Sequence, residues 1–235
     1  MTDAAASSSP GSGLLDLGSP PVAGLILTGG ASRRMGFDKA KMVIEGEPIR
    51  QRLIGVLCEV ASPVLEVGPG NWGLVAVREE PAGGGPLVAV AAGWTALREL
   101  EHMGPVIVLA CDLPLLDLAL VRFLAEWASA GSVVPVVAGQ PQPLCARWSA
   151  ADLEVAVALV ASGERSMRAL WTRVDVALVD EGDWGRFTTA TAFADVDFPA
   201  DLERLRAALD SRCRAVRLAI ATRCPCISRG RGLCC

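Results

Sequence analysis

A short apolar strand that runs into a basic, glycine-rich loop constrains this chain more than any other feature of its 235 residues. The apolar run covers residues 22–27, and the loop (28–40) reads Thr-Gly-Gly-Ala-Ser-Arg-Arg-Met-Gly-Phe-Asp-Lys-Ala. Glycines let the backbone approach an anion closely and turn N–H groups towards it, while Arg33, Arg34 and Lys39 supply balancing positive charge. The pattern therefore predicts a buried strand followed by a loop that binds phosphates.

This Gly-rich loop differs from the two common nucleotide-binding loops. It contains neither the G-x-x-x-x-G-K-[ST] of a P-loop nor the G-x-G-x-x-G of a dinucleotide-binding turn. The chain has 22 Lys plus Arg, and its only two lysines, Lys39 and Lys41, both lie in or next to the loop. The concentration of lysine here favours a phosphate-binding loop over a basic surface turn.

Strand-like and helix-like segments alternate along the rest of the chain. Apolar runs predict strands at 64–67, 74–77, 106–110, 133–137, 142–147 and 174–179, and helical spacing predicts helices at 48–60, 88–100, 117–130, 152–162, 166–171 and up to 209. This alternation indicates an α/β fold with a doubly wound, mostly parallel sheet. Ligands of such sheets bind beyond the carboxyl ends of the strands, so we expect the Gly-rich loop and Asp112 at one rim.

Composition divides the chain into three parts. Residues 1–20 are rich in Ala, Ser, Gly and Pro without the pattern of a signal peptide, and we expect a disordered leader. Residues 211–235 hold six arginines, no acidic residue and five of the eight cysteines, and we expect a disordered basic tail. Residues 21–210 are long enough for one domain.

Charge and hydropathy exclude some classes of function. Residues 1–210 hold 16 basic and 26 acidic groups, a balance of −10, which argues against nucleic acid as a partner. No apolar run approaches the roughly 18 residues needed to span a bilayer. Cys58, Cys111 and Cys145 are scattered singly in apolar contexts, which is typical of buried, reduced cysteines, so we expect a cytoplasmic protein.

The Gly-rich loop closely resembles the signature of the molybdenum cofactor guanylyltransferase (MobA-like nucleotidyltransferase) family, Leu-Ala-Gly-Gly-x-Ser-x-Arg-Met-Gly-x-Asp-Lys. Thr28 stands where that family usually has Ala. The resemblance covers nearly all of residues 22–209 and implies a Rossmann-like nucleotidyltransferase fold of three α/β/α layers. It also implies that Arg34 and Lys39 offset phosphate charge during catalysis, and that the nucleotide is bound by Leu27, Thr28, Gly29, Gly30 and Lys39.

Asp112 follows the apolar run 106–110. From its position alone it is equally compatible with a turn or helix-capping residue and with a Mg²⁺ ligand facing a phosphate loop. The Cys-Asp-x-Pro string at 111–114 resembles the family motif in which the Asp binds the metal. The resemblance therefore implies that Asp112 is a metal ligand that also belongs to the catalytic and nucleotide-binding sets.

Asp195 and Asp197 form an extended Asp-x-Asp whose side chains should point to one side. Two carboxylates on one side are costly unless a cation neutralises them, although a solvated loop before a helix is the alternative. The segment resembles the family's Phe-x-Asn/Asp-x-Asn-Thr-Pro-x-Asp-Leu, with Phe198 for Thr and Asp197 for Asn. It implies that one or both carboxylates complete a Mg²⁺ site, without choosing between them.

Three further segments resemble family motifs. Glu79-Glu80 before Gly-Gly-Pro-Leu resembles the acidic residue that accepts hydrogen bonds from guanine; Glu80 is the first choice and Glu79 the second, and an exposed acidic loop is the alternative. The segments at 142–144 and 165–170 resemble those on the acceptor side. There Arg165 and Arg168 contact either a phosphate or solvent.

The resemblance implies a complete reaction. GMP would pass from GTP to the terminal phosphate of molybdenum-molybdopterin with Mg²⁺ as cofactor, releasing pyrophosphate and forming the guanine dinucleotide cofactor. The partners implied are GTP and molybdenum-molybdopterin, with no nucleic acid and no membrane, and transient contact with molybdoenzymes or other cofactor-biosynthesis proteins is allowed.

The sequence is also compatible with other functions. The alternatives are cytidylyl transfer to the same cofactor, nucleotidyl transfer to a sugar phosphate or other phosphorylated acceptor, and a non-catalytic nucleotide-binding protein. Ser-His-Asp or Cys-His catalysis would depend on His102, the only histidine, which we expect at the surface.

Overall fold

The computed structural model describes residues 21–29, 43–44 and 46–196. The expected leader, the expected tail and the closing helix lie outside the described residues. Five residues of the predicted site also lie outside them: Gly30, Arg33, Arg34, Lys39 and Asp197.

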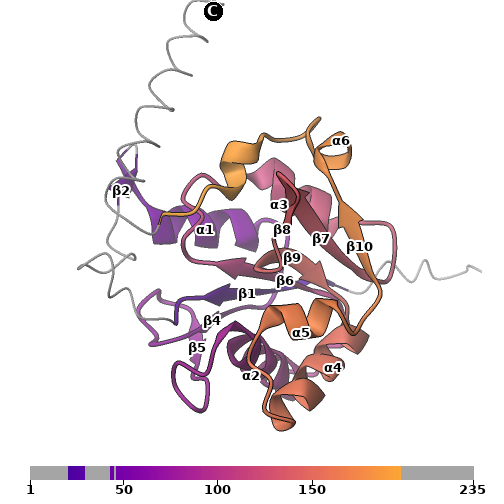
Figure 1. Ribbon diagram of the computed structural model, residues 1–235. Helices are drawn as coiled ribbons and strands as arrows, with labels where there is room; N and C mark the ends of the chain where they lie inside the picture. Colours follow the sequence, from indigo (N-terminus) through magenta and orange to yellow (C-terminus); the bar gives the residue numbers. More distant parts are fainter. Residues whose placement is uncertain (1–20, 30–42, 45, 197–235) are drawn as a thin grey trace, which may run out of the picture.

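One sheet organises the described part of the chain (Figure 1). Its order is β10-β7-β9-β6-β1-β4-β5, and β8 pairs with β7 beside this path. Along the path every neighbouring pair is parallel except those of β9, which runs antiparallel to β6 and β7. The strands are β1 (Ala23–Leu27), β4 (Val64–Val67), β5 (Val75–Val77), β6 (Val106–Ala110), β7 (Ser132–Val137), β8 (Gln140–Pro141), β9 (Cys145–Trp148) and β10 (Val176–Val179).

Helices cover both faces of the sheet, which confirms the predicted three-layer α/β/α architecture (Figure 1). One face packs against α1 (Ile49–Cys58), α3 (Leu118–Ala125), α6 (Glu181–Trp184) and a 3-10 turn (Ala190–Phe193). The other face packs against α2 (Pro86–Glu99), α4 (Ala150–Ala161) and α5 (Met167–Trp171). A short antiparallel pair, β2 (Val43–Ile44) and β3 (Glu47–Pro48), precedes α1.

Two glycines allow helices to pack closely on β1 from opposite sides. A Cβ built on Gly24 in β1 would lie 2.6 Å from Leu57 Cδ2 of α1, and a Cβ on Gly93 in α2 would lie 2.6 Å from Leu25 Cδ1 of β1. Every residue of β1 is buried, which explains why this strand is a continuous apolar run and not an alternating one. The carboxyl end of β1, where the Gly-rich loop begins, is therefore held between two packed layers.

The helix expected at 117–130 is shorter in the structure. Asp117 caps the first turn of α3 by accepting a hydrogen bond from the Leu120 N–H at 2.9 Å. The helix ends at Ala125, and Arg147 Nη1 donates to the carbonyl oxygens of Ser129 at 3.1 Å and Gly131 at 2.6 Å. Because the carbonyls at 129 and 131 bond to a distant arginine, this segment is a loop leading into β7.

Two sequence-based expectations about burial are wrong. His102 is only 6% exposed, since its Nε2 donates to the Pro105 carbonyl at 3.2 Å and its ring meets Trp94 edge-on. Cys58, expected to be buried, is exposed at the end of α1. Within the described residues, no helix is both long and apolar enough to cross a membrane.

Candidate active site

The carboxyl ends of β1 and β6 meet at one edge of the sheet, which we call the carboxyl rim. The strands are parallel neighbours, with Leu27 opposite Ala110, and the Cys111 N–H donates to the Leu27 carbonyl at 3.2 Å. The Val196 N–H in turn donates to the carbonyl oxygen of Asp112 at 3.0 Å. The structure thus brings the start of the Gly-rich loop, Asp112 and the segment of Asp195 together, while their roles stay predictions.

The charges near Asp112 make this part of the rim electronegative. Asp112 is half-buried and Asp195 is exposed. Cys145 of β9 is buried opposite the end of β6, and burial, together with the negative charges of Asp117 and Asp112, raises the pKa of its thiol to about 12.

The donor set at Asp112 fits Mg²⁺, which prefers carboxylate oxygens and keeps several waters or substrate phosphates as ligands. Asp195 directly precedes Val196, whose N–H donates to the Asp112 carbonyl. The part of the chain that the structure describes contains no group of three or more His, Cys, Asp or Glu side chains arranged for a metal. A site on Asp112 and Asp195 would therefore need other ligands.

Glu79 lies beside the first glycine of the Gly-rich loop. A Cβ built on Gly29 would be 3.4 Å from Glu79 Oε1, and this oxygen accepts a hydrogen bond from the Gly83 N–H at 2.8 Å. Gly29 itself is fixed because the N–H groups of Thr28 and Gly29 both donate to the Val67 carbonyl, at 2.9 and 3.2 Å. The half-buried carboxylate of Glu79 is thereby held beside the first glycine of the predicted nucleotide-binding loop.

Glu80, the first choice from the sequence for the base-binding acid, lies elsewhere. It is exposed and lines a groove of about 380 Å³ with Val88 and Thr95 of α2 and Val157 of α4. The structure therefore places Glu79, and not Glu80, beside the first glycine of the Gly-rich loop.

The two segments expected on the acceptor side also border the rim. The Leu87 N–H donates to the Arg165 carbonyl at 3.1 Å, and a Cβ on Gly84 would lie 3.0 Å from Arg165 Nη1. The Leu144 carbonyl accepts from the Ala110 N–H at 2.8 Å, directly before Cys111 and Asp112. Arg165 is exposed beside the glycine turn, so its guanidinium is accessible to an anionic ligand.

Glu66 is a residue that sequence reasoning missed. It lies in β4 with no exposed surface, although carboxylates are rarely buried completely. Its carboxylate accepts four hydrogen bonds, one of them from Thr28 Oγ1 at 2.7 Å. The signal in the sequence was the single charge inside the apolar run Val-Leu-Glu-Val.

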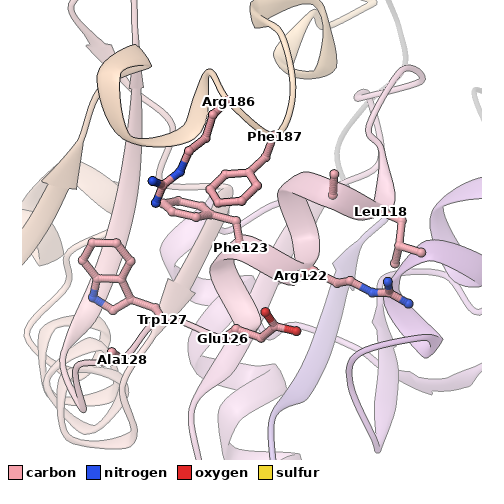
Figure 2. A pocket seen from close by; sticks show the side chains of 9 residues that line it. Leu118, Arg122, Phe123, Glu126, Trp127, Ala128, Arg186 and Phe187 are labelled. Atoms are coloured by element: carbon pink, nitrogen blue, oxygen red, sulfur yellow. The ribbon is translucent and has the colours of Figure 1, made fainter.

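A separate groove of about 710 Å³ lies on the outer side of α3. Phe123 packs against both Trp127 and Phe187 (Figure 2). The guanidinium carbon of Arg186 lies 4.7 Å from the centre of the Phe187 ring. Glu126 is the only carboxylate among its lining residues, and none of the strand ends at the carboxyl rim contributes to it. With a single carboxylate, the groove lacks the cluster of acidic ligands that a Mg²⁺ site requires.

Comparison with solved structures defines the class of fold. Molybdopterin-guanine dinucleotide biosynthesis protein A from Archaeoglobus fulgidus matches with a TM-score of 0.63 at 20% identity, over 80% of this chain and 99% of that chain. CTP:phosphocholine cytidylyltransferase from Streptococcus pneumoniae matches with a TM-score of 0.58 at 15% identity, over 80% and 99% of the two chains. The fold is that of nucleotidyltransferases.

Sequence comparison is more specific. The MobA-like NTP transferase domain model matches residues 24–178. A protein of Pelotomaculum thermopropionicum named probable molybdenum cofactor guanylyltransferase is 30% identical over 190 residues, covering 78% of this chain and 91% of that protein. The chain belongs to the MobA-like NTP transferase family and is a nucleotidyltransferase.

Proposed function

We propose that this nucleotidyltransferase transfers GMP from GTP to the terminal phosphate of molybdenum-molybdopterin, forming the guanine dinucleotide cofactor and releasing pyrophosphate. The observation that carries the proposal is the pair of backbone hydrogen bonds, from Cys111 to Leu27 and from Val196 to Asp112, which joins the three predicted site segments. The name of the P. thermopropionicum relative supports the choice of donor and acceptor.

The reaction needs no protein nucleophile. An oxygen of the acceptor phosphate attacks the α-phosphorus of GTP in line, the bond from the α-phosphorus to the bridging α–β oxygen breaks, and pyrophosphate leaves with that oxygen. The protein therefore contributes positioning and charge stabilisation. Arg34 and Lys39, outside the described residues, are the groups we propose to offset charge on the β- and γ-phosphates.

We assign the Mg²⁺ ligands to Asp112 together with Asp195, Asp197 or both. Magnesium, when bound, supplies positive charge that stabilises the phosphate oxygens in the transition state. The chain itself contributes by positioning. The backbone hydrogen bond from the Val196 N–H to the Asp112 carbonyl holds the segments of Asp112 and Asp195 in fixed register.

The base preference follows from Glu79. Guanine presents N1–H and its 2-amino group as adjacent donors, and a carboxylate accepts from both. Cytosine presents its amino group next to the unprotonated N3. N3 is an acceptor, so a carboxylate repels it. Glu79 is held beside Gly29, so we propose that it reads guanine while the backbone of Leu27, Thr28, Gly29 and Gly30 contacts the rest of the nucleotide.

The acceptor site has a basic component. Arg165 and Arg168 are exposed, and the Arg165 carbonyl is hydrogen-bonded to Leu87 at the start of α2. We propose that Arg165 pairs with the terminal phosphate of the acceptor, because a guanidinium binds phosphate through parallel hydrogen bonds.

Cytidylyl transfer is the second candidate, favoured by the structural similarity to a cytidylyltransferase. The two are separated by thermal unfolding with GTP, CTP, ATP or UTP, each with and without Mg²⁺, since a ligand of the folded state raises Tm according to its affinity. We expect stabilisation by GTP that is strengthened by Mg²⁺ and lost in Asp112→Asn. Preference for CTP would replace the guanylyl assignment, and no response to any nucleotide would refute the donor site.

A further inference from the structure

Glu66 joins two segments that are far apart in the sequence. Its Oε1 accepts from Thr28 Oγ1 at 2.7 Å and from the N–H groups of Gly70 and Asn71 at 2.9 and 3.1 Å, while Oε2 accepts from the Trp72 N–H at 2.8 Å. Thr28 opens the Gly-rich loop, and residues 70–72 form the turn after β4. We call this arrangement the Glu66 junction.

The backbones are also in direct contact at the Glu66 junction. Gly68 has φ +155°, and a Cβ built on it would overlap Thr28 Oγ1 and lie 2.8 Å from the Gly29 nitrogen. The Val67 carbonyl accepts from the N–H groups of both Thr28 and Gly29. No side chain other than hydrogen fits at position 68 unless the start of the Gly-rich loop moves.

The junction fixes the spacing between the two halves of the proposed donor site. Gly29 lies against Glu79, and the predicted phosphate-binding residues follow Gly29 in the sequence. If Thr28 loses its bond to Glu66, only the two backbone bonds to the Val67 carbonyl hold Gly29 beside Glu79, and the separation of base and phosphates is fixed less firmly. A change in this separation weakens binding of the donor nucleotide and leaves binding of the acceptor unchanged.

We propose that Glu66 is a positioning residue which, through Thr28, holds the first residues of the Gly-rich loop in the register that the donor nucleotide needs. This role rests on the proposed nucleotidyl transfer, but it does not depend on which base the donor carries. A carboxylate suits this position because it accepts all four hydrogen bonds, whereas an amide would turn a donor towards the Trp72 N–H.

Thr28→Val tests the proposal, because valine keeps the shape of threonine and removes the hydroxyl. We expect the KM for the donor to rise about tenfold, since hydrogen bonds to charged groups are among the stronger ones, with the KM for the acceptor unchanged. Thr28→Ser keeps a hydroxyl and is expected to restore the donor KM. Rescue of this kind separates loss of the hydrogen bond from a change in packing.

Ser132→Ala is the matched control. Ser132 Oγ donates to Asp152 Oδ2 at 2.5 Å, a second hydroxyl–carboxylate bond, but Ser132 begins β7 at the rim opposite the candidate site. Because Ser132 Oγ also accepts from the Ser149 N–H at 2.8 Å, we expect Ser132→Ala to lower Tm at least as much as Thr28→Val without raising the donor KM. Equal donor KM values in the two variants, or no rescue by Thr28→Ser, would overturn the positioning role.

The donor used in these assays is whichever of GTP, CTP, ATP and UTP stabilises the unmodified protein most. If that nucleotide is not GTP, the guanylyl assignment fails while the test of Glu66 stands. If it is GTP and Thr28→Val leaves its KM unchanged, the role of Glu66 fails alone.

Discussion

Gly68→Ala is expected to destabilise the protein more than an equivalent change at a glycine with free space around it. Gly68 has φ +155° and Gly73 has φ +85°, so alanine is strained at both positions by about 1–2 kcal/mol. At Gly73 nothing lies within 4 Å of the added Cβ, whereas at Gly68 the Cβ overlaps Thr28 Oγ1. The two variants therefore differ in steric overlap, which at Gly68 involves the Thr28 hydroxyl and the backbone nitrogen of Gly29.

The difference in magnitude follows from the hydrogen bond that Thr28 donates to Glu66. Displacing the hydroxyl leaves a buried carboxylate with three partners in place of four, and a hydrogen bond to a charged group contributes about 1.5–3 kcal/mol. For a protein of this size each kcal/mol shifts Tm by about 2–4 °C. We expect the Tm of Gly68→Ala to lie about 3–12 °C below that of Gly73→Ala.

Thermal unfolding followed by circular dichroism measures this difference, and urea unfolding checks it through the midpoint at unchanged m-value. A Tm of Gly68→Ala within about 1 °C of that of Gly73→Ala would refute the reasoning, because it would mean that Thr28 moves at no cost.

The remaining predictions concern single side chains. Asp112→Asn should lower kcat by about a hundredfold or more with a native circular dichroism spectrum, and near-normal Mg²⁺-dependent turnover would contradict the metal assignment. Glu79→Gln should raise the KM for GTP about tenfold, whereas Glu80→Gln should leave it unchanged; the reverse order would restore Glu80 as the base-binding acid. Because the pKa of Cys145 is raised from 9.0 to about 12, its contribution to the free energy of unfolding is full below pH 9.0 and falls as pH rises towards 12. Cys145→Ala should flatten that part of the pH dependence, and maleimide at about pH 8 should label the exposed Cys58 but not Cys145.

The core of the fold could be predicted because its strands are buried on both faces. The runs at 23–27, 64–67 and 106–110 are strands β1, β4 and β6, as the continuous apolar pattern indicates. The direction of β9 could not be predicted, since an apolar run reads the same in a parallel and an antiparallel strand. The end of α3 could not be predicted, because the loop that follows is bound by Arg147 of β9 and the sequence near residue 125 carries no sign of this contact.

The candidate site was predicted where it follows from topology. Asp112 and the start of the Gly-rich loop lie at one rim because β1 and β6 are parallel neighbours. From the sequence Glu80 was the first choice and Glu79 the second, and only the fold shows that Glu79 is the one that lies beside Gly29. Glu66 escaped notice because its hydroxyl partner, Thr28, is 38 residues away and only the fold brings them together.

Transfer of label from GTP tests the central claim most directly. The protein is incubated with Mg²⁺, molybdenum-molybdopterin and GTP or CTP labelled at the α-phosphate, and the labelled product and pyrophosphate are both measured. The proposed function predicts that label passes from GTP to the acceptor with one pyrophosphate released per transfer, and that CTP transfers little. Transfer from CTP in preference to GTP, or no transfer from either nucleotide, would contradict it.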